Sequence, residues 1–379
     1  VYHTVADGIG FATYGAAAVT NIPLPPSQFR SEIAFPGYDR PETLTDIPLL
    51  VVLGTNVPGF DYSQFRGAAG ADLRFTDEAN VHILDHEVDV WNTAGLSRVW
   101  VKVPALSNGC RIAATWGHPG YQAPPCTTNG GVWSNDYLGV WHLRETAGPH
   151  RDSSPAFATS RFVSVAAQGV ATGIVGGCDN FVAASSHHVS LPHMGTNAAV
   201  TVEGWFYLTA PPGGNDIGLI SSDPWTAGVT HFKINSAYQL KGEVNGGGFI
   251  TSPTNQVSMS NWFHAAYTVA GAGGTDFRIY GNGGLIGAAG GRTNNDLSDV
   301  NIAREFNGRY LNARVDEVRI SRVARSSNWL WAVHRNLASN GAFVAYGVVS
   351  NQYPNTAPLL AGVSDRVASA GAWLVPTND

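Results

Sequence analysis

Hydrophobic and polar residues alternate along most of the chain, and the alternation comes in short runs. Between Phe29 and Trp133 six such runs follow one another, separated by turn residues: SEIAF, DIPLLVVLG, ADLRFTD, VHILDHEVDVW, SRVWVKVP and CRIAATWG. Alternation with a period of two is typical of strands that bury one face. This region is therefore predicted to consist of strand after strand.

A further alternating run begins at Arg314 and leads into a short helix. Its side chains are expected to split between two faces, with Val315, Glu317 and Arg319 on one and Asp316, Val318 and Ile320 on the other. Ser326 can then N-cap a helix that carries Trp329, Leu330 and Val333 at helical spacing. We therefore expect this segment to close a sandwich. It should not host a catalytic carboxylate pair, because Asp316 and Glu317 would face opposite sides.

Composition supports an all-β protein and excludes two function classes. The chain holds 44 glycines, 11% aromatic residues and only 13% charged residues. Gly-rich turns between aromatic and β-branched runs are typical of β structure. The net charge is −6 and there is no basic run, so no nucleic-acid partner is expected. No apolar run approaches the roughly 20 residues of a membrane-spanning helix, so no membrane span is expected.

One acidic stripe lies in the first half of the chain. Asp85, Glu87 and Asp89 share a strand face at every second position. A cation could bind such a stripe. The favoured interpretation is a solvated face of an antiparallel sheet, and no metal site with His82 or His86 is expected.

Two blocks of sequence resemble known bacterial families. FPGYDRPETLTDIPLLVVL, HEVDVWNTAGLSRVWVKVPAL and AATWGHPGYQAP resemble an uncharacterised envelope-protein β-domain family. LGVWHLRE, VTVEGWFYL, NWFHAAYTV and FNGRYLNARVDEVRIS resemble the laminin-G-like, concanavalin A-like jelly roll that often follows it. The ending NTAPLLAGVSDRV resembles the start of an immunoglobulin- or cadherin-like repeat.

The resemblance implies an all-β architecture, a small β-sandwich followed by a jelly roll. The expected divisions are an N-terminal extension or a strand of a neighbouring module at 1–28, the sandwich at 29–136, the jelly roll at 137–350 and a tail at 351–379. This tail would be the start of a repeat or a donor strand. Because the chain starts at Val1 with no Met, we expect a processed product or a fragment.

Three functions remain open on this resemblance. The first is a non-catalytic module that binds carbohydrate or matrix, or mediates adhesion, with a polysaccharide or a surface protein as partner. It would be secreted, at the cell surface or in the periplasm. The second is a structural subunit of a surface filament or envelope assembly that self-associates through its terminal tails. The third is a diverged glycoside hydrolase, although the E-x-D-x-x-E strand motif of such jelly rolls is absent.

The candidate ligand-binding residues are two aromatic residues outside the regular strands. Trp225, in SSDPWTAG, and Tyr238, near a turn, could stack on sugar rings if they are exposed. No catalytic residue is expected.

The laminin-G-like resemblance implies a possible Ca²⁺ site. Its ligands would be Asp179, Asn180 and Asp316. The alternative is that Asp179 and Asn180 cap a turn.

Three cysteines complete the sequence picture. Cys110 and Cys126 flank a Gly/Pro-rich loop, and an extracellular location predicts a disulfide between them, with Cys178 left over. The alternative is three reduced thiols.

Overall fold

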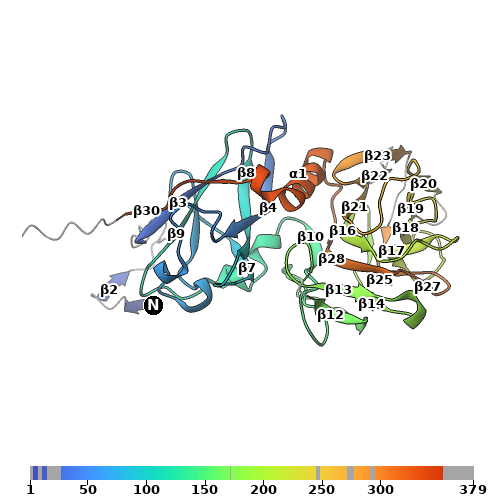
Figure 1. Cartoon of the computed structure of the whole chain (residues 1–379), viewed down its shortest axis with the longest axis horizontal. Helices are drawn as coiled ribbons and strands as arrows, with labels where there is room; N and C mark the ends of the chain where they lie inside the picture. Colours follow the sequence, from blue (N-terminus) through green and yellow to red (C-terminus); the bar gives the residue numbers. More distant parts are fainter. Residues whose placement is uncertain are drawn as a thin grey trace, which may run out of the picture.

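The computed structural model describes residues 3–6, 11–14, 27–170, 172–244, 248–270, 277–290 and 295–352. It contains two β-sandwiches side by side (Figure 1). The all-β prediction is confirmed, because antiparallel sheets dominate and the α-helices are confined to α1 (Ser327–Ala338) and α2 (Asn340–Phe343) in the described ranges. None of the helices described there has the length and apolar character that crossing a membrane requires.

The N-terminal sandwich contains two sheets. One has the order β29–β3–β9–β5–β6, with β30 also paired to β3: β3 (Phe29–Ala34), β5 (Arg74–Asp77), β6 (Ile83–Leu84), β9 (Arg111–Trp116), β29 (Ala345–Tyr346) and β30 (Ser350–Asn351). The other has the order β4–β8–β7: β4 (Leu44–Leu53), β7 (His86–Val90) and β8 (Ser97–Leu106). A separate hairpin joins β1 (His3–Ala6) to β2 (Phe11–Tyr14).

The jelly roll contains two larger sheets. We call the sheet whose outer face packs against α1 and the N-terminal sandwich the covered sheet, and the opposite one the open sheet. The covered sheet has β10 paired to β28 and the order β12–β13–β28–β16–β21–β22–β23: β10 (Tyr137–Trp141), β12 (Ala167–Val170), β13 (Cys178–Phe181), β16 (Val200–Leu208), β21 (Trp262–Val269), β22 (Phe277–Gly281), β23 (Gly284–Ala289) and β28 (Ala313–Ser321). The open sheet has the order β11–β14–β25–β17–β18–β19–β20: β11 (Phe162–Ser164), β14 (His188–Ser190), β17 (Ile217–Ser222), β18 (Thr230–Ile234), β19 (Leu240–Val244), β20 (Phe249–Thr251) and β25 (Val300–Ile302).

Short elements complete the chain. Two small ladders pair β15 (Thr196–Asn197) with β24 (Asn295–Asp296), and β26 (Arg304–Glu305) with β27 (Arg309–Tyr310). Single 3₁₀ turns lie at η1 (Tyr62–Gln64), η2 (Ala68–Gly70), η3 (Pro125–Thr127), η4 (Gly131–Trp133) and η5 (Ala183–Ser185).

Two hydrophobic cores hold the molecule together. The jelly-roll core fills the space between the covered and open sheets. The other core fills the N-terminal sandwich and continues through α1 onto the outer face of the covered sheet, where it reaches Trp205 and Tyr280. Since one apolar cluster spans both sandwiches, the N-terminal domain and α1 bury that face of the jelly roll.

Helix α1 lies at the junction of the two domains (Figure 1). The predicted cap is confirmed, because the Ser326 hydroxyl accepts a hydrogen bond from the Trp329 amide at 3.1 Å. The Asn336 side chain on the last turn bonds the backbone of Leu50 on β4, accepting from its N–H at 2.6 Å and donating to its carbonyl at 3.1 Å. The helix thus supplies β4 with the hydrogen bonds that a neighbouring strand would make.

The segment after the helix returns to the first domain. Strands β29 and β30 both pair with β3. The predicted jelly-roll range 137–350 therefore ends in a stretch that belongs to a sheet of the N-terminal sandwich. Of the predicted tail, only Asn351 and Gln352 are described, so donation of a strand by residues 353–379 lies outside the described residues.

Strand β28 departs from the predicted alternation. Its register with β16 shifts between the pairs Glu203–Arg319 and Trp205–Asp316, and Glu317 has a left-handed φ of 53°. This inserted residue is a β-bulge. It brings Asp316 and Glu317 to the same outer face as Arg319, while the jelly-roll core receives Val315, Val318 and Ile320. The expectation that Asp316 and Glu317 face opposite sides is wrong.

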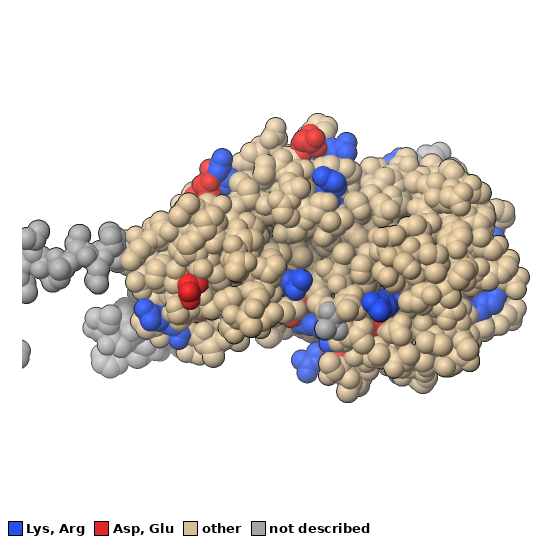
Figure 2. All heavy atoms as spheres, in the orientation of Figure 1, with Lys and Arg blue, Asp and Glu red and all other residues tan. Residues whose placement is uncertain are grey.

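Charged side chains are sparse on the face of the molecule that Figure 2 draws. In the view of Figure 2, Lys and Arg are scattered and do not gather into one patch. On this face, the distribution agrees with the absence of a basic run in the sequence.

Candidate functional site

An open pocket lies on the outer face of the open sheet. Its walls are Asn215, Trp225, Phe306, Asn307 and Arg309, and it encloses about 500 Å³. Trp225 comes from the β17–β18 loop, and the last three come from the β26–β27 hairpin. The hairpin turns at Asn307 and Gly308, both of which have left-handed φ angles, as their residue types favour.

Trp225 is the exposed aromatic surface of this pocket. Its side chain is 43% exposed, and its ring centroid lies 5.6 Å from that of Phe306. Underneath, the ring contacts His231 at a centroid distance of 4.7 Å and the Lys233 ammonium at 5.2 Å. The Trp225 ring is thus supported from below by β18 while part of it faces solvent.

The floor beneath the ring consists of paired charges. Lys233, which is 1% exposed, bonds Glu243 at 2.7 Å, and Lys241 bonds Asp216 at 2.8 Å. These pairs satisfy the buried groups, as partly buried charges require. The pair with Glu243 also fixes the position of Lys233, on which the Trp225 ring rests.

The His231 ring completes the floor. It lies 2.9 Å from the fully buried carboxylate of Glu305 on β26. This contact links the β26–β27 hairpin to β18, the strand beneath Trp225. The two walls of the pocket, Trp225 and the hairpin, therefore rest on one connected set of buried polar groups.

The two residues predicted to bind sugar are not brought together. Tyr238 lies in the β18–β19 turn with a left-handed φ of 54°, partly buried against the jelly-roll core. The Trp225 loop leads into the opposite end of β18. Trp225 is therefore the member of the predicted pair that lines the pocket. Sequence reasoning missed Phe306 and Arg309, although the dipeptide Asn307-Gly308 is a hairpin signal.

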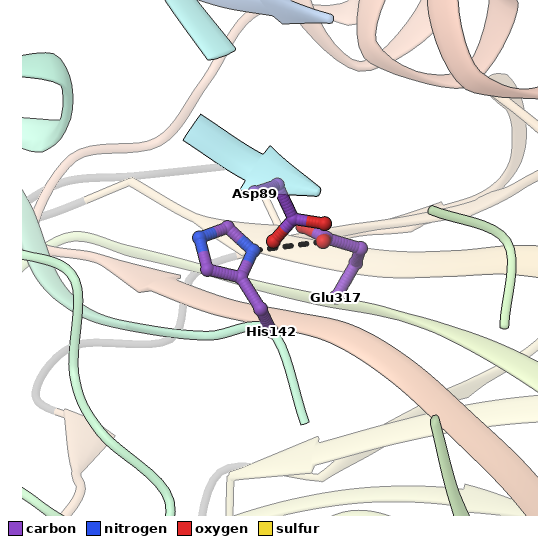
Figure 3. A group of neighbouring side chains, drawn as sticks. All are labelled: Asp89, His142 and Glu317. Atoms are coloured by element: carbon purple, nitrogen blue, oxygen red, sulfur yellow. Dashed lines mark hydrogen bonds and ion pairs between the residues drawn. The ribbon is translucent and has the colours of Figure 1, made fainter. Parts of the chain in front are cut away.

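A second cluster of polar residues lies where the two domains meet. Asp89 from β7, His142 just after β10, and Glu317 from the β28 bulge point toward one another (Figure 3). His142 Nδ1 lies 2.8 Å from a Glu317 carboxylate oxygen. One potential ligand atom from each of the three residues lies within 4.8 Å of the others.

Arginines neutralise this cluster. Arg144 donates to Asp89 at 2.6 Å and to Glu87 at 3.2 Å, and Arg319 bonds Glu317 at 2.7 Å. A metal ion would have to displace Arg144 from Asp89 and would meet the repulsion of a second guanidinium. The donor set therefore fits an ion-pair network between the domains better than a metal centre.

The surroundings shift the pKa values of this network. Burial disfavours the charged form of His142, but the adjacent Glu317 and Glu87 carboxylates raise its pKa well above the usual value. Burial also opposes ionisation of Glu87, yet His142 and Arg144 lower its pKa to about 2. For Asp89, burial dominates and raises the pKa to about 6. Neighbouring charges therefore set the direction of the pKa shift for His142 and Glu87, whereas burial sets it for Asp89.

The interface corrects the interpretation of the acidic stripe. Asp85 is partly exposed and pairs with Lys102 at 2.7 Å. The side chains of Glu87 and Asp89, in contrast, are 10% and 2% exposed, because the jelly roll covers that face of β7. A solvated face is thus the wrong interpretation for Glu87 and Asp89.

The predicted calcium ligands do not converge. The Asp179 carboxylate lies 2.7 Å from the His150 ring and accepts a hydrogen bond from the Gly169 amide. Asp179 pairs with Val315, which faces the jelly-roll core, whereas Asp316 accepts from the Val175 amide on the opposite, covered face. Asn180, which follows Asp179 on β13, pairs with Arg314 on β28. These residues do not fit a shared Ca²⁺ site.

The predicted disulfide is not present. Cys110, Cys126 and Cys178 are all free thiols. Cys110 follows the β8–β9 turn, while Cys126 lies in η3 with its sulfur 3.8 Å from His86 Nδ1 on β7. The two cysteines flanking the loop therefore sit in different surroundings.

Comparison with known families identifies the second domain. Residues 182–330 match the sequence profile of the concanavalin A-like lectin/glucanases superfamily. This stretch forms a concanavalin A-like domain. The predicted resemblance is thereby confirmed for the jelly roll, while the preceding envelope-protein family and the terminal repeat stay predictions. No curated protein matches the sequence.

Solved structures resemble the chain only distantly. The binding domain of Paraclostridial Mosquitocidal Protein 1 is 13% identical with a TM-score of 0.42, over 53% of this chain and 52% of that one. Trypanosoma rangeli sialidase in complex with sialic acid is 13% identical with a TM-score of 0.44, over 68% and 43%. Domain 4 of AbnA, a GH43 extracellular arabinanase from Geobacillus stearothermophilus, with arabinotriose, is 11% identical with a TM-score of 0.41, over 52% and 98%. The chain thus spans about half or less of the first two structures.

Proposed function

We propose that the concanavalin A-like domain binds carbohydrate, without catalysis, in the pocket formed by Trp225 and Phe306. The observation that carries this proposal is the Trp225 ring, 43% exposed on one side and supported by His231 and Lys233 on the other. Sugar rings present apolar C–H faces that stack on such aromatic surfaces, and polar side chains nearby can bond their hydroxyls. Asn215 and Asn307 supply these polar groups in the walls.

Binding is favoured over hydrolysis by the chemistry of the walls. A glycosidase needs two carboxyl groups on either side of the scissile bond, about 5–9.5 Å apart depending on mechanism. The wall residues of this pocket, all within the described part of the chain, include no carboxylate. The nearby acids Asp216, Glu243 and Glu305 are each engaged by a lysine or histidine.

The ligand would be a polysaccharide met outside the cytoplasm. This part of the proposal rests on the lectin-like superfamily of the domain and on the family resemblance of the N-terminal half. A pocket open to solvent on one side suits a chain-like ligand that extends beyond it. The N-terminal sandwich would then serve to present the jelly roll, since it covers the other sheet.

A glycan array followed by titration calorimetry tests the proposal. We expect saturable binding by the full chain and a loss of at least about tenfold in affinity for Trp225→Ala. Phe162→Ala is the matched control, because Phe162 is an aromatic of similar exposure, 49%, on β11 at the far edge of the same sheet. Equal losses for both variants, or no binding to any glycan by the parent chain, would show the proposal to be wrong.

A further inference from the structure

The cationic side chains around the Trp225 pocket differ in how closely a carboxylate of the protein pairs with them. Lys233 and Lys241 each form a short ion pair, at 2.7 and 2.8 Å, with Glu243 and Asp216. Arg304, on β26 of the hairpin, also has a carboxylate partner, Asp223, at 2.9 Å. These three cations are therefore already neutralised by neighbours within the protein.

Arg309 is different. Its nearest carboxylate oxygen among the described residues belongs to Glu305 and lies 3.8 Å away, beyond hydrogen-bond distance. Its Nε–H donates to the Phe306 carbonyl at 3.1 Å, which restrains the orientation of the guanidinium. The two Nη groups form no hydrogen bond within the described part of the chain, and the side chain is 29% exposed in the pocket wall.

The surroundings hold this guanidinium in place through its Nε–H and leave its two Nη groups free within the described part of the chain. Glu305 is fully buried and lies 2.9 Å from His231, so its carboxylate is not available to a ligand. The Asn307–Gly308 turn sets the path of β27 and thereby the position of Arg309. The result is a planar cation with free donors, held beside the aromatic surface of Trp225.

A planar guanidinium with free Nη donors matches the geometry of a carboxylate or sulfate group. We propose that the pocket selects an anionic saccharide, whose sugar ring stacks on Trp225 while its uronic-acid carboxylate or sulfate ester bonds Arg309. This inference rests on the proposed carbohydrate function and specifies its ligand class. A neutral sugar would leave the Arg309 donors to water and gain only the stacking contact.

Matched ligand pairs test the inference. One set consists of uronate oligosaccharides, each with its carboxyl-reduced form, and the other of sulfated oligosaccharides, each with its desulfated form. We expect the parent chain to prefer the anionic member of at least one pair by about tenfold at low salt, as one charge-assisted contact gives. The preference should shrink as ionic strength rises, because the contact is partly exposed. Which set shows it distinguishes carboxylate from sulfate.

Variants separate this inference from the proposed function. Arg309→Gln should abolish the preference, so that both members of a pair bind with equal affinity. Arg309→Lys should retain part of the preference, because it keeps the positive charge but loses the planar pair of Nη donors. Trp225→Ala should weaken binding of both members. Equal binding of both members in every pair, or a preference that persists in Arg309→Gln, would overturn the inference while leaving carbohydrate binding intact. Failure of the parent chain to bind any member would overturn both.

Discussion

The two outer faces of the jelly roll carry similar residues but have different surroundings. Both hold histidine–carboxylate contacts and aromatic rings beside cations. On the covered sheet, Arg319 is 1% exposed and stacks over Trp100 and Trp133 of the N-terminal half at 4.5 and 4.9 Å. On the open sheet, Trp225 covers Lys233 from outside and remains 43% exposed.

The difference teaches that side-chain chemistry alone does not mark a binding site. The cluster of Asp89, His142 and Glu317 has the residue types of a metal centre. Its residues come from both domains, and Arg144 of the jelly roll bonds Asp89 and Glu87 of the N-terminal sandwich, so the cluster works as part of an interface. The Trp225 pocket contains fewer charged residues in its walls, but among the described residues no other domain covers it. Substitutions on the covered face should therefore lower the free energy of unfolding, whereas substitutions on the open face should leave it nearly unchanged.

The largest effect is expected for Arg319→Ala. This change removes a buried cation that bonds Glu317 at 2.7 Å and leaves His142, at 2.8 Å, as the remaining partner of that buried carboxylate. Breaking a buried ion pair from one side typically costs about 3–5 kcal/mol. Urea unfolding should show the loss.

The control for this change is Arg322→Ala. Arg322 pairs with Asp136 at 3.1 Å, but their side chains are 60% and 45% exposed, so a loss below about 1 kcal/mol is expected. If the two variants lose similar free energies of unfolding, the buried ion pair of the covered face does not stabilise the junction of the two domains.

The second effect concerns the docking of α1. In Asn336→Ala, the backbone N–H of Leu50 on β4 loses its buried acceptor at 2.6 Å, while the Leu50 carbonyl loses one donor at 3.1 Å and keeps Asn340 at 2.9 Å. Unsatisfied buried groups of this kind cost about 1–3 kcal/mol. The same variant should speed amide hydrogen exchange at Leu50. Unchanged exchange there would mean that the helix does not complete the edge of β4.

The regular strands and the start of α1 could be predicted from the sequence better than the irregular positions in the strands. Period-two alternation correctly indicated the strands, and Ser326 correctly indicated the start of α1. Alternation failed at Glu317, because a bulge places this non-glycine residue in a left-handed conformation that no local residue type signals. Local patterns describe regular structure, and an inserted residue breaks the rule on which they depend.

The site predictions show a second limit. Trp225 could be anticipated because a loop tryptophan between turn residues is often exposed. Glu87 and Asp89 could not be recognised as buried, since the domain that covers them is distant in sequence. Arg309 was missed because its free donors become evident only when the partners of Lys233, Lys241 and Arg304 are known.

The third effect is a pH dependence centred on His150. Burial lowers its pKa, but the carboxylates of Asp179 and Glu145, at 2.7 and 2.9 Å, raise it to about 9. A raised pKa contributes stability below the unfolded value of about 6.5, which is lost as pH rises through 9. Glu145, whose pKa His150 lowers to about 2 against the effect of burial, contributes above about 4.5 and loses its contribution as pH falls through 2.

Stability from this pair should therefore be greatest between about pH 4.5 and 6.5. His150→Gln should remove about 2 kcal/mol in that range and less at pH 9.5, measured by urea unfolding across pH. His193→Gln is the control, because His193 is 58% exposed and lies 3.7 Å from Asp299. A loss in His150→Gln that is the same at every pH would assign it to packing and not to charge.

The smallest effect on stability is expected on the open face. Trp225→Ala removes a ring that is 43% exposed and belongs to neither hydrophobic core. The ion pairs beneath it, Lys233 with Glu243 and Lys241 with Asp216, remain in place. Surface changes away from core packing usually alter stability by no more than about 0.5 kcal/mol. Thermal unfolding should therefore be nearly unchanged while glycan binding is lost. A loss of stability as large as that of Arg319→Ala would mean that Trp225 holds the open sheet together, and the contrast between the two faces would disappear.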